Sequence, residues 1–359
     1  MIRIRTGKVM KIMEERADIQ VVVIDLEGKP AKGINYPLLT GKVNGGDMVQ
    51  VNTTAVDLGL GTGGYHFIMA NLQNKGEEYP LKPGHIMKMR YAPHQVKVLA
   101  VEEKESPYHK EIKNFTSLQN TPVLIGFLHS MLLPALAGIR AVNDKLKVSY
   151  IMTDGGALPL AFSKTVQKAR ELNWLKGTIT VGHAFGGDLE AVNIYSGLAA
   201  GKAVHKADLL VIIMGPGIVG TGTKWGTTAL EVGQIVNAVA SLEGRPIVIP
   251  RISFQDKRER HQGLSHHVLT VLQKIALAPS TVVFPLLDNE EALNYLKGQI
   301  SEYNLTQKHK IVFEDGRPGL NYLQDHNLEV TTMGRSLGEE KEFFLAASAA
   351  GSFAAKLMQ

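Results

Sequence analysis

The chain has 359 residues, 44% of them hydrophobic and 20% charged, which is enough material for two domains with a sizeable core. It contains no cysteine, so disulfides, a thiol nucleophile and cysteine-ligated metal sites are excluded. The formal net charge is +5 and no long run of like charges occurs. This balance suits a small anionic ligand and does not favour a nucleic-acid partner.

The start of the chain has no apolar segment followed by a small-residue cleavage site, so we expect a cytoplasmic protein. Residues 121–142 are apolar over a length that could span a membrane, but they include Pro122, His129 and Pro134. A buried strand followed by a buried helix explains this segment better, and no membrane association is expected.

Residues 1–103 are predicted to form a small β-barrel or β-sandwich domain. They contain short segments rich in β-branched or aromatic residues and bounded by Gly, Pro, Asn or Asp, as is typical of strands. These segments are Val21–Asp25, Gly46–Asn52, Gly64–Leu72, His85–Pro93 and Gln95–Glu103. Residues 104–121 are polar without clear periodicity, which predicts a linker.

Residues 122–359 are predicted to form a three-layer, Rossmann-like α/β domain with a mostly parallel sheet, because continuous apolar strands alternate with helices. The predicted strands are Val123–Leu128, Val148–Met152, Thr178–Gly182, Asp208–Met214, Pro246–Pro250, Thr281–Leu286, Lys310–Phe313 and Leu328–Met333. Predicted helices include Ser163–Leu175 and Ser265–Leu277. The small residues of Phe343–Met358 favour close helix packing, either within the chain or across a homodimer.

Polar and glycine residues follow several predicted strands, at the edge where open α/β sheets bind ligands. His129, Asp154 and His183 are the candidate catalytic residues, as general acids or bases. With Asp188, the same residues could instead hold a divalent metal. Each also has a structural alternative: Asp154 could cap a turn, Asp188 could be the N-cap of the next helix, and the histidines could be structural.

The segment Gly215–Gly226 has glycines at the G-x-G-x-x-G spacing after a predicted strand. Pro216 removes a backbone donor, further glycines delay the helix, and the next strand ends in Arg251 instead of an acidic residue. An arginine there could accept a 2′-phosphate, so an NADP-type oxidoreductase stays open. A P-loop does not fit, because Thr223 stands where lysine is required.

The broader prediction is a set of loops that bind an anion beside a helix N-terminus. Its candidate binding residues are Ser130, Gly155, Gly156, Gly186, Gly187, Gly215, Gly217, Gly220, Thr221, Gly222, Thr223, Lys224, Arg251 and His266. Tight packing between strand and helix is the alternative reason for the glycines. Residues 251–267 are dense in basic side chains that could clamp a phosphate or carboxylate. Ser265 is a predicted N-cap, and His261 is not at a one-face helical spacing from His266.

Several segments together resemble one protein family. They are NTTAVDLGLGTGGYHF, PGHIMKMRYAP, GFLHSMLLPALAG, MTDGGALPLAFS and GPGIVGTGTKWG. They are similar to domain-of-unknown-function family 3866, and the resemblance spans essentially the whole chain. It implies a bacterial cytoplasmic protein and carries no assigned activity or catalytic residue.

The leading hypothesis from the sequence is an enzyme, of the hydrolase or transferase class, acting on a phosphorylated or carboxylated small molecule. The glycine loops and Arg251 would hold the anion, and His129, Asp154 and His183 would supply acid–base or metal chemistry. The alternatives are an NADP-type oxidoreductase and a non-catalytic sensor or scaffold that binds a nucleotide. The cofactor is open between a divalent metal and a nucleotide.

Overall fold

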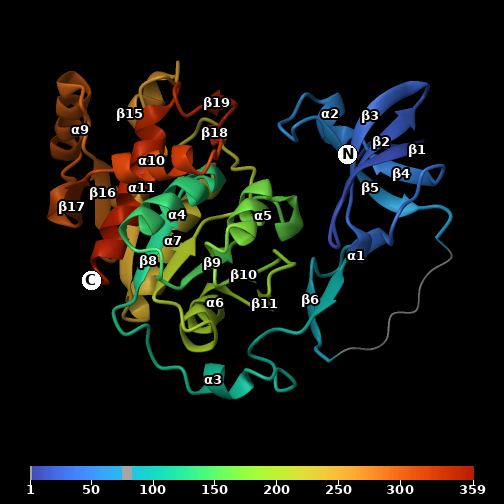
Figure 1. Ribbon diagram of the computed structural model, residues 1–359, viewed down its shortest axis with the longest axis horizontal. Coiled ribbons are helices and arrows are strands. Elements are labelled where there is room, and N and C mark those ends of the chain that lie inside the picture. Colours follow the sequence, from blue (N-terminus) through green and yellow to red (C-terminus); the bar gives the residue numbers. More distant parts are fainter. Residues whose placement is uncertain (1, 75–82) are drawn as a thin grey trace. The chain divides into compact units, whose positions relative to one another are not determined.

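The computed structural model describes residues 2–74 and 83–359 and divides into two compact units (Figure 1). The first comprises Met1–Pro83 and Met89–Lys97, and the second Gly84–Lys88 and Val98–Gln359. The short strands β6 (Ile86–Lys88) and β7 (Val96–Val98) lie where the chain passes between units. The expected linker, 104–121, belongs to the second unit and contains the short helix α3 (His109–Lys113).

The first unit is a closed five-stranded barrel with the strand order β1-β2-β3-β5-β4, which confirms the predicted small β domain. Its strands are β1 (Ile4–Glu15), β2 (Gln20–Leu26), β3 (Lys29–Asn35), β4 (Met48–Asn52) and β5 (Tyr65–Asn71). The short helices α1 (Pro37–Thr40) and α2 (Thr54–Asp57) connect them. Alternate residues of the strands, such as Val22, Ile24, Val49 and Val51, fill the barrel core.

The sequence pattern did not predict β1 or β3. The pairing of β1 with β2 changes register between Val9 and Lys11 and again between Ile12 and Glu14. Each irregularity interrupts the two-residue alternation by which a strand is recognised. In β3, Pro30 and Gly33 lower the β-propensity of the segment.

The second unit contains an eight-stranded sheet in which every pair of neighbouring strands is parallel, in the order β11-β10-β9-β12-β8-β13-β16-β17. These strands are β8 (Pro122–Gly126), β9 (Val148–Met152), β10 (Gly177–Thr180), β11 (Leu189–Glu190), β12 (Leu209–Ile212), β13 (Arg245–Ile249), β16 (Thr281–Pro285) and β17 (Lys310–Glu314). The predicted strand Leu328–Met333 is wrong as a member of this sheet. Only Thr331–Thr332 (β18) is extended, and it pairs with Arg335–Ser336 (β19) in a separate hairpin.

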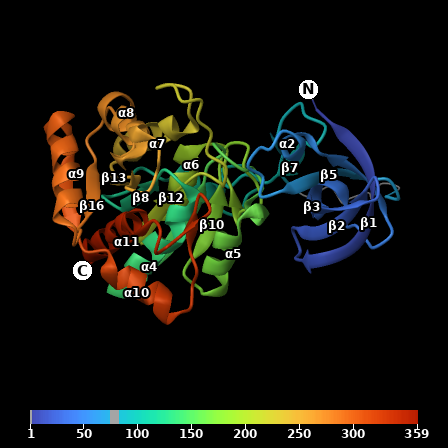
Figure 2. The same cartoon turned by 90° about the horizontal axis from the view of Figure 1, so that it is seen from above.

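Helices cover both faces of the sheet, so the three-layer prediction is confirmed (Figure 2). One face carries α4 (Leu132–Val142), α5 (Lys164–Glu171), α10 (Arg317–Asp325) and α11 (Lys341–Lys356). The other carries α6 (Ile194–Ala199), α7 (Glu231–Ser241), α8 (His266–Thr270) and the π-helical turn η6 (Val271–Ile275). The helix α9 (Glu290–Glu302) contacts the short strand β15 (Gly263–Leu264), which pairs with β14 (Ile252–Ser253).

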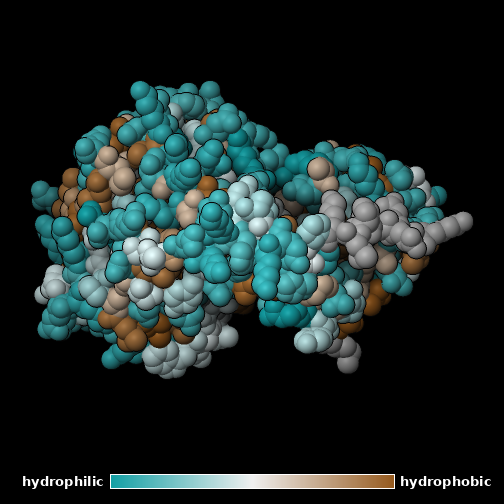
Figure 3. Space-filling view, turned by 90° about the horizontal axis from the view of Figure 1, so that it is seen from below, coloured by the Kyte–Doolittle hydropathy of each residue, from teal (hydrophilic) through white to brown (hydrophobic). Residues whose placement is uncertain are grey.

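The segment 121–142, considered as a membrane span, forms β8 and α4, and almost all of it is buried. Across the described part of the chain, the structure contains no helix of the length and apolarity that a membrane crossing needs. Hydrophilic residues predominate on the face drawn in Figure 3, where hydrophobic residues form only scattered patches.

The order of the strands places a topological switch point at the middle of the sheet. The chain leaves β8 through α4 on one face and leaves the adjacent β12 through α7 on the opposite face. The helices that follow two neighbouring strands therefore diverge beyond the carboxyl ends of those strands. Ligands in open α/β sheets bind in the crevice at such a switch point.

Candidate functional site

His129 follows β8 and lies in the 3₁₀ turn η1 (His129–Met131) at this switch point. Its ring is buried, with Nδ1 3.0 Å from the carbonyl oxygen of Met214, to which it donates. Nε2 lies 2.6 Å from the Ser163 hydroxyl, which therefore donates to it. Burial lowers the pKa of His129 to about 4, so the ring is a neutral acceptor at neutral pH. Ser163 also caps α5 by accepting from the amide of Val166.

Asp154 and His183 contact each other through the backbone. A carboxylate oxygen of Asp154 accepts from the amide of His183 at 2.8 Å. The carboxylate thus bonds to the turn that follows β10, 29 residues further along the chain. The contacts of His129 described above are to other groups, and the role of the three residues in one reaction stays a prediction.

Asp188 is not a helix N-cap, which corrects that expectation. The cap of α6 is Asn193, whose side chain accepts from the amides of Tyr195 and Ser196. Asp188 instead pairs with Arg170 and accepts from the amide and hydroxyl of Thr178. Its carboxylate therefore already has a cation and two further donors.

Glu231 is an ionisable side chain near the switch point that the sequence pattern did not select. It is the first residue of α7, and its Oε1 accepts from the Thr153 hydroxyl at 2.5 Å. Burial raises the pKa of Glu231 to about 7, the Thr153 hydrogen bond opposes the shift, and the charge of Asp154 adds to it. A carboxyl group that titrates near neutrality can both take and give a proton.

Two predicted glycine turns meet beside Glu231. A Cβ on Gly155 would lie 2.4 Å from Oε2 of Glu231, and one on Gly156 would lie 2.2 Å from the carbonyl oxygen of Gly215. Gly215 in turn leaves no room for a Cβ beside the carbonyl of Ala157. These glycines allow the loops after β9 and β12 to contact each other directly.

The rest of the glycine segment forms a hairpin-like loop. Gly220 pairs with Thr227, and the amide of Thr221 donates to the carbonyl of Gly226. The hydroxyls of Thr221 and Thr223 bond to each other, and the amide of Gly226 donates to Thr223. The loop then leads into the 3₁₀ turn η4 (Thr228–Leu230), whose N-cap is Thr227.

The tip of this loop is exposed and carries basic groups. Lys224 lies over the ring of Trp225, 5.2 Å from its centroid. The guanidinium nitrogens of Arg260 lie 4.0 Å from the position of a Cβ on Gly222, and Gly217 and Gly222 have positive φ angles of 106° and 77°. The positive φ angles explain why glycines occur in this loop, and Arg260 places a cation beside its tip.

Other predicted binding groups have partners within the chain. The amide of Gly186 donates to Glu190, and that of Gly187 donates to the Thr180 hydroxyl. Ser130 donates to Thr332 at 2.9 Å, which joins the loop after β8 to the hairpin β18–β19.

A cavity of about 580 Å³ lies beside this hairpin. Its lining residues are Gln255, Asp256, Lys257, Arg258, Met333, Arg335, Gly338 and Glu339. Small-molecule sites commonly have volumes of this order. Arg335 pairs with the buried carboxylate of Glu340 at 2.6 Å, and within the described part of the chain its buried Nε has no hydrogen-bond partner.

Arg251 contacts this cavity through Asp256, one of its lining residues. It is buried and pairs with Asp256 at 3.1 Å, and Asp256 also pairs with Arg258 at 2.7 Å. The hydrogen bonds and the charge of Arg258 hold the pKa of Asp256 far below its usual range, although burial opposes the shift. A second contact of Arg251, 3.4 Å long, reaches Nδ1 of His261.

His261, His266 and His267 form a cluster next to Arg251. One ring nitrogen from each lies within 4.8 Å of the others. The sequence pattern selected His266 as a binding residue and placed His261 outside a one-face helical spacing from it. His261 in fact lies in the 3₁₀ turn η5 (Glu259–His261), which β15 separates from α8, so helical spacing does not apply. The signal in the sequence is three histidines within seven residues.

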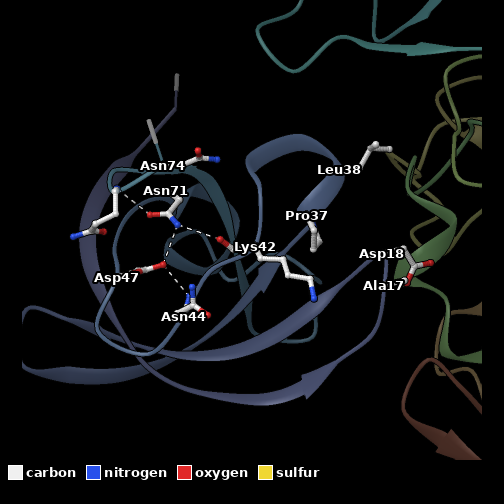
Figure 4. Close-up of a pocket in the computed structure, with 10 residues that line it drawn as sticks. Ala17, Asp18, Pro37, Leu38, Lys42, Asn44, Asp47, Asn71 and Asn74 are labelled. Atoms are coloured by element: carbon white, nitrogen blue, oxygen red, sulfur yellow. Dashed lines mark hydrogen bonds between the residues drawn. The ribbon is translucent and has the colours of Figure 1, made fainter. Parts of the chain in front are cut away.

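Two further places could hold a ligand. In the first unit, a cavity of about 720 Å³ is lined by amide side chains, by the charged residues Asp18, Lys42 and Asp47, and by apolar residues (Figure 4). Its amides are largely bonded within the barrel, where Asn71 donates to Asp47 at 2.9 Å. In the second unit, His85, Glu103 and Glu105 also bring ligand atoms within 4.8 Å of one another, but His85 and Glu105 are exposed and His85 pairs directly with Glu103.

A family model described as "Protein of unknown function (DUF3866)" matches residues 32–351. Searches of curated proteins and of solved structures returned no match.

Proposed function

The chain belongs to the DUF3866 family, and we propose that it is an enzyme acting on a phosphorylated or carboxylated small molecule at the carboxyl ends of the parallel strands. The 580 Å³ cavity carries this proposal. Lys257, Arg258 and Arg335 line it against two acidic residues, Asp256 and Glu339. Asp256 is already neutralised by Arg251 and Arg258, so the lining favours an anion.

Arg335 is the residue best prepared for an anion. One face of its guanidinium pairs with Glu340, while the buried Nε lacks an acceptor. A buried donor without a partner is costly, and a carboxylate or phosphate oxygen would satisfy it. Charge-assisted hydrogen bonds contribute about 1.5–3 kcal/mol each.

In this proposal, the side chains at the switch point of the sheet perform the acid–base chemistry. Glu231 has a pKa of about 7, and His129 is a neutral ring bonded to a serine hydroxyl. His129 and Arg251 follow β8 and β13 at the same sheet edge, and Glu231 begins the helix α7 that comes after β12. Paired ionisable groups with separated pKa values are the usual equipment of an acid–base catalyst.

The test is a thermal-shift screen of nucleotides, nicotinamide cofactors, sugar phosphates and carboxylates, with turnover assays on the hits. A ligand at one hundred times its dissociation constant stabilises by about 2.7 kcal/mol. We expect Arg335→Gln to weaken binding about 10- to 100-fold, the equivalent of one charge-assisted hydrogen bond.

The matched control is Arg245→Gln, because Arg245 is exposed at the amino end of β13, the opposite edge of the sheet. Equal affinity in wild type and Arg335→Gln would contradict the assignment of the cavity. An equal loss in Arg245→Gln would show a general charge effect instead. Binding without turnover of any hit would favour the non-catalytic sensor.

A further inference from the structure

We propose that His261, His266 and His267 form a binding site for a divalent transition metal of the Zn²⁺ type, with its fourth position open to an anionic oxygen. The inference deepens the proposed function and rests on it only for the identity of the fourth ligand. Three imidazoles with an open fourth position are one of the ligand sets of catalytic zinc.

The geometry is close to that of a bound metal. The three ring nitrogens lie within 4.8 Å of one another. Nitrogens about 2.1 Å from a tetrahedral Zn²⁺ are about 3.4 Å apart, so shifts of about 1 Å would complete the site. The ring centroids of His266 and His267 are already 3.9 Å apart, and that of His261 lies 5.1 and 5.5 Å from them.

Unpartnered nitrogens are the second, independent observation. Nε2 of His266 and Nδ1 of His267 are buried and have no hydrogen-bond partner among the residues that the structure describes. His267 is only 8% exposed, so water does not easily satisfy its ring. Buried polar atoms are nearly always paired, and two orphaned imidazole nitrogens in one cluster indicate a missing ligand.

His261 has the support that a metal ligand needs. Its Nδ1 lies 2.8 Å from the hydroxyl of Ser265. A metal on Nε2 requires Nδ1 to carry the proton and donate it to Ser265. The 3.4 Å approach of the Arg251 guanidinium to Nδ1 is then not a hydrogen bond, because both groups are donors. Ligating histidines usually donate their other ring N–H to an acceptor of this kind, which fixes the orientation of the ring.

The charged groups around the three histidines determine which fourth ligand the metal would take. Asp256 offsets part of the charge of Arg251 and Arg258, while Arg260 adds another cation. A dication here therefore gains from an anionic fourth ligand. Since Arg251 contacts both His261 and Asp256 of the cavity wall, that ligand would be hydroxide or an oxygen of the bound anion.

The experiment uses the full-length protein, freed of metal with a chelator, and titrates Zn²⁺ alone by calorimetry and Co²⁺ alone by absorption. We expect one Zn²⁺ per chain and the visible spectrum of four-coordinate Co²⁺. His267→Gln should lower Zn²⁺ affinity by more than about tenfold, because even outer-shell substitutions cost 10–100-fold. His326→Gln is the matched control, since His326 is exposed and bonds to the carbonyl of Tyr322.

The proposal is overturned if wild type takes up no stoichiometric Zn²⁺, or if His267→Gln binds as tightly as wild type. Loss of binding in His85→Gln without loss in His267→Gln would also overturn it, by assigning the metal to the other cluster. Circular dichroism reports whether each variant folds. If His267→Gln does not fold, the Co²⁺ spectrum of wild type decides: four-coordinate supports the site, and six-coordinate contradicts it.

Both titrations contain no substrate, so their failure is separate from that of the proposed function. Zn²⁺ bound by the histidines in a protein that binds no anion would leave the metal site standing and remove the anion cavity. If the protein binds an anion through Arg335 but has no affinity for Zn²⁺, the anion cavity stands and the metal site is rejected.

Discussion

Glu231 couples the stability of the fold to pH. Its pKa is raised from 4.5 to about 7, so between these values the folded protein holds a proton that the unfolded chain releases. The stabilising contribution is complete below about pH 4.5 and is lost as the pH rises through 7. We predict that Glu231→Gln loses less stability than wild type between pH 5 and pH 8, by on the order of 2 kcal/mol.

Urea unfolding at the two pH values measures this difference, and comparing variant with wild type cancels the titration of all other groups. An identical pH dependence in both proteins would show that Glu231 ionises normally. At the same edge His129 has the opposite sign: its pKa is lowered to about 4, so its contribution is lost as the pH falls from 6.5.

The sequence located these residues only in part. His129, Asp154 and Arg251 stand directly after apolar strands, so the rule for strand ends was sufficient to select them. Glu231 lies sixteen positions beyond Gly215, inside a predicted helix, and only the folded loop returns it to Thr153. Arg335 contacts Glu340 and lines a cavity with Arg258, which is far away in sequence, so no local pattern predicts that cavity.

At the scale of elements, α4, α10 and α11 pack at backbone distance through glycines. A Cβ on Gly138 of α4 would lie 2.1 Å from the carbonyl oxygen of Ser348, and one on Gly351 of α11 would lie 2.0 Å from that of Ala135. The small residues of α11 thus serve packing within the chain. A homodimer remains an expectation from the sequence.

We predict that Gly138→Ala destabilises the protein by about 1–3 kcal/mol or more, because the added methyl group meets backbone, which cannot move aside easily. Gly298→Ala in α9 is the control, since a Cβ there meets no atom within 4 Å. It should be neutral or stabilise by up to about 1 kcal/mol through helix propensity. Chemical denaturation of the two variants checks the prediction, and equal effects would refute the close packing of α4 on α11.

The strands and helices were predicted correctly where the hydrophobic pattern of the sequence is regular. The buried parallel strands are continuous apolar runs, and β9 was predicted at its observed bounds, Val148–Met152. The predicted helix Ser265–Leu277 is divided into α8 and the π turn η6. Its N-cap, Ser265, was predicted correctly, because capping is a local interaction that the sequence shows directly.

A buried lysine anchors the chain at the start of the second unit. Lys88 of β6 is fully buried, and its ammonium group donates to the carbonyls of Thr180 and Ala184 and to Glu190. All three of its donors are used, which is the condition under which a buried ammonium is tolerated. This contact joins segments about a hundred residues apart, and the local pattern around Lys88 gave no sign of it.

At the scale of the whole molecule, we propose that the functional site lies at the carboxyl edge of the parallel sheet. There the loops after β9 and β12 contact each other, and the loop after β8 contacts the hairpin β18–β19. The wild-type protein is predicted to bind an anionic small molecule there, and binding should slow amide hydrogen exchange in those loops, because a bound ligand suppresses local opening.

The most direct measurement is hydrogen exchange by mass spectrometry, with and without the strongest stabiliser from the anion screen. We predict that protection of amides from exchange concentrates in residues 127–131, 153–156, 213–230, 251–261 and 331–340. Protection confined to the barrel, or to the loops at the amino ends of the strands, would contradict it.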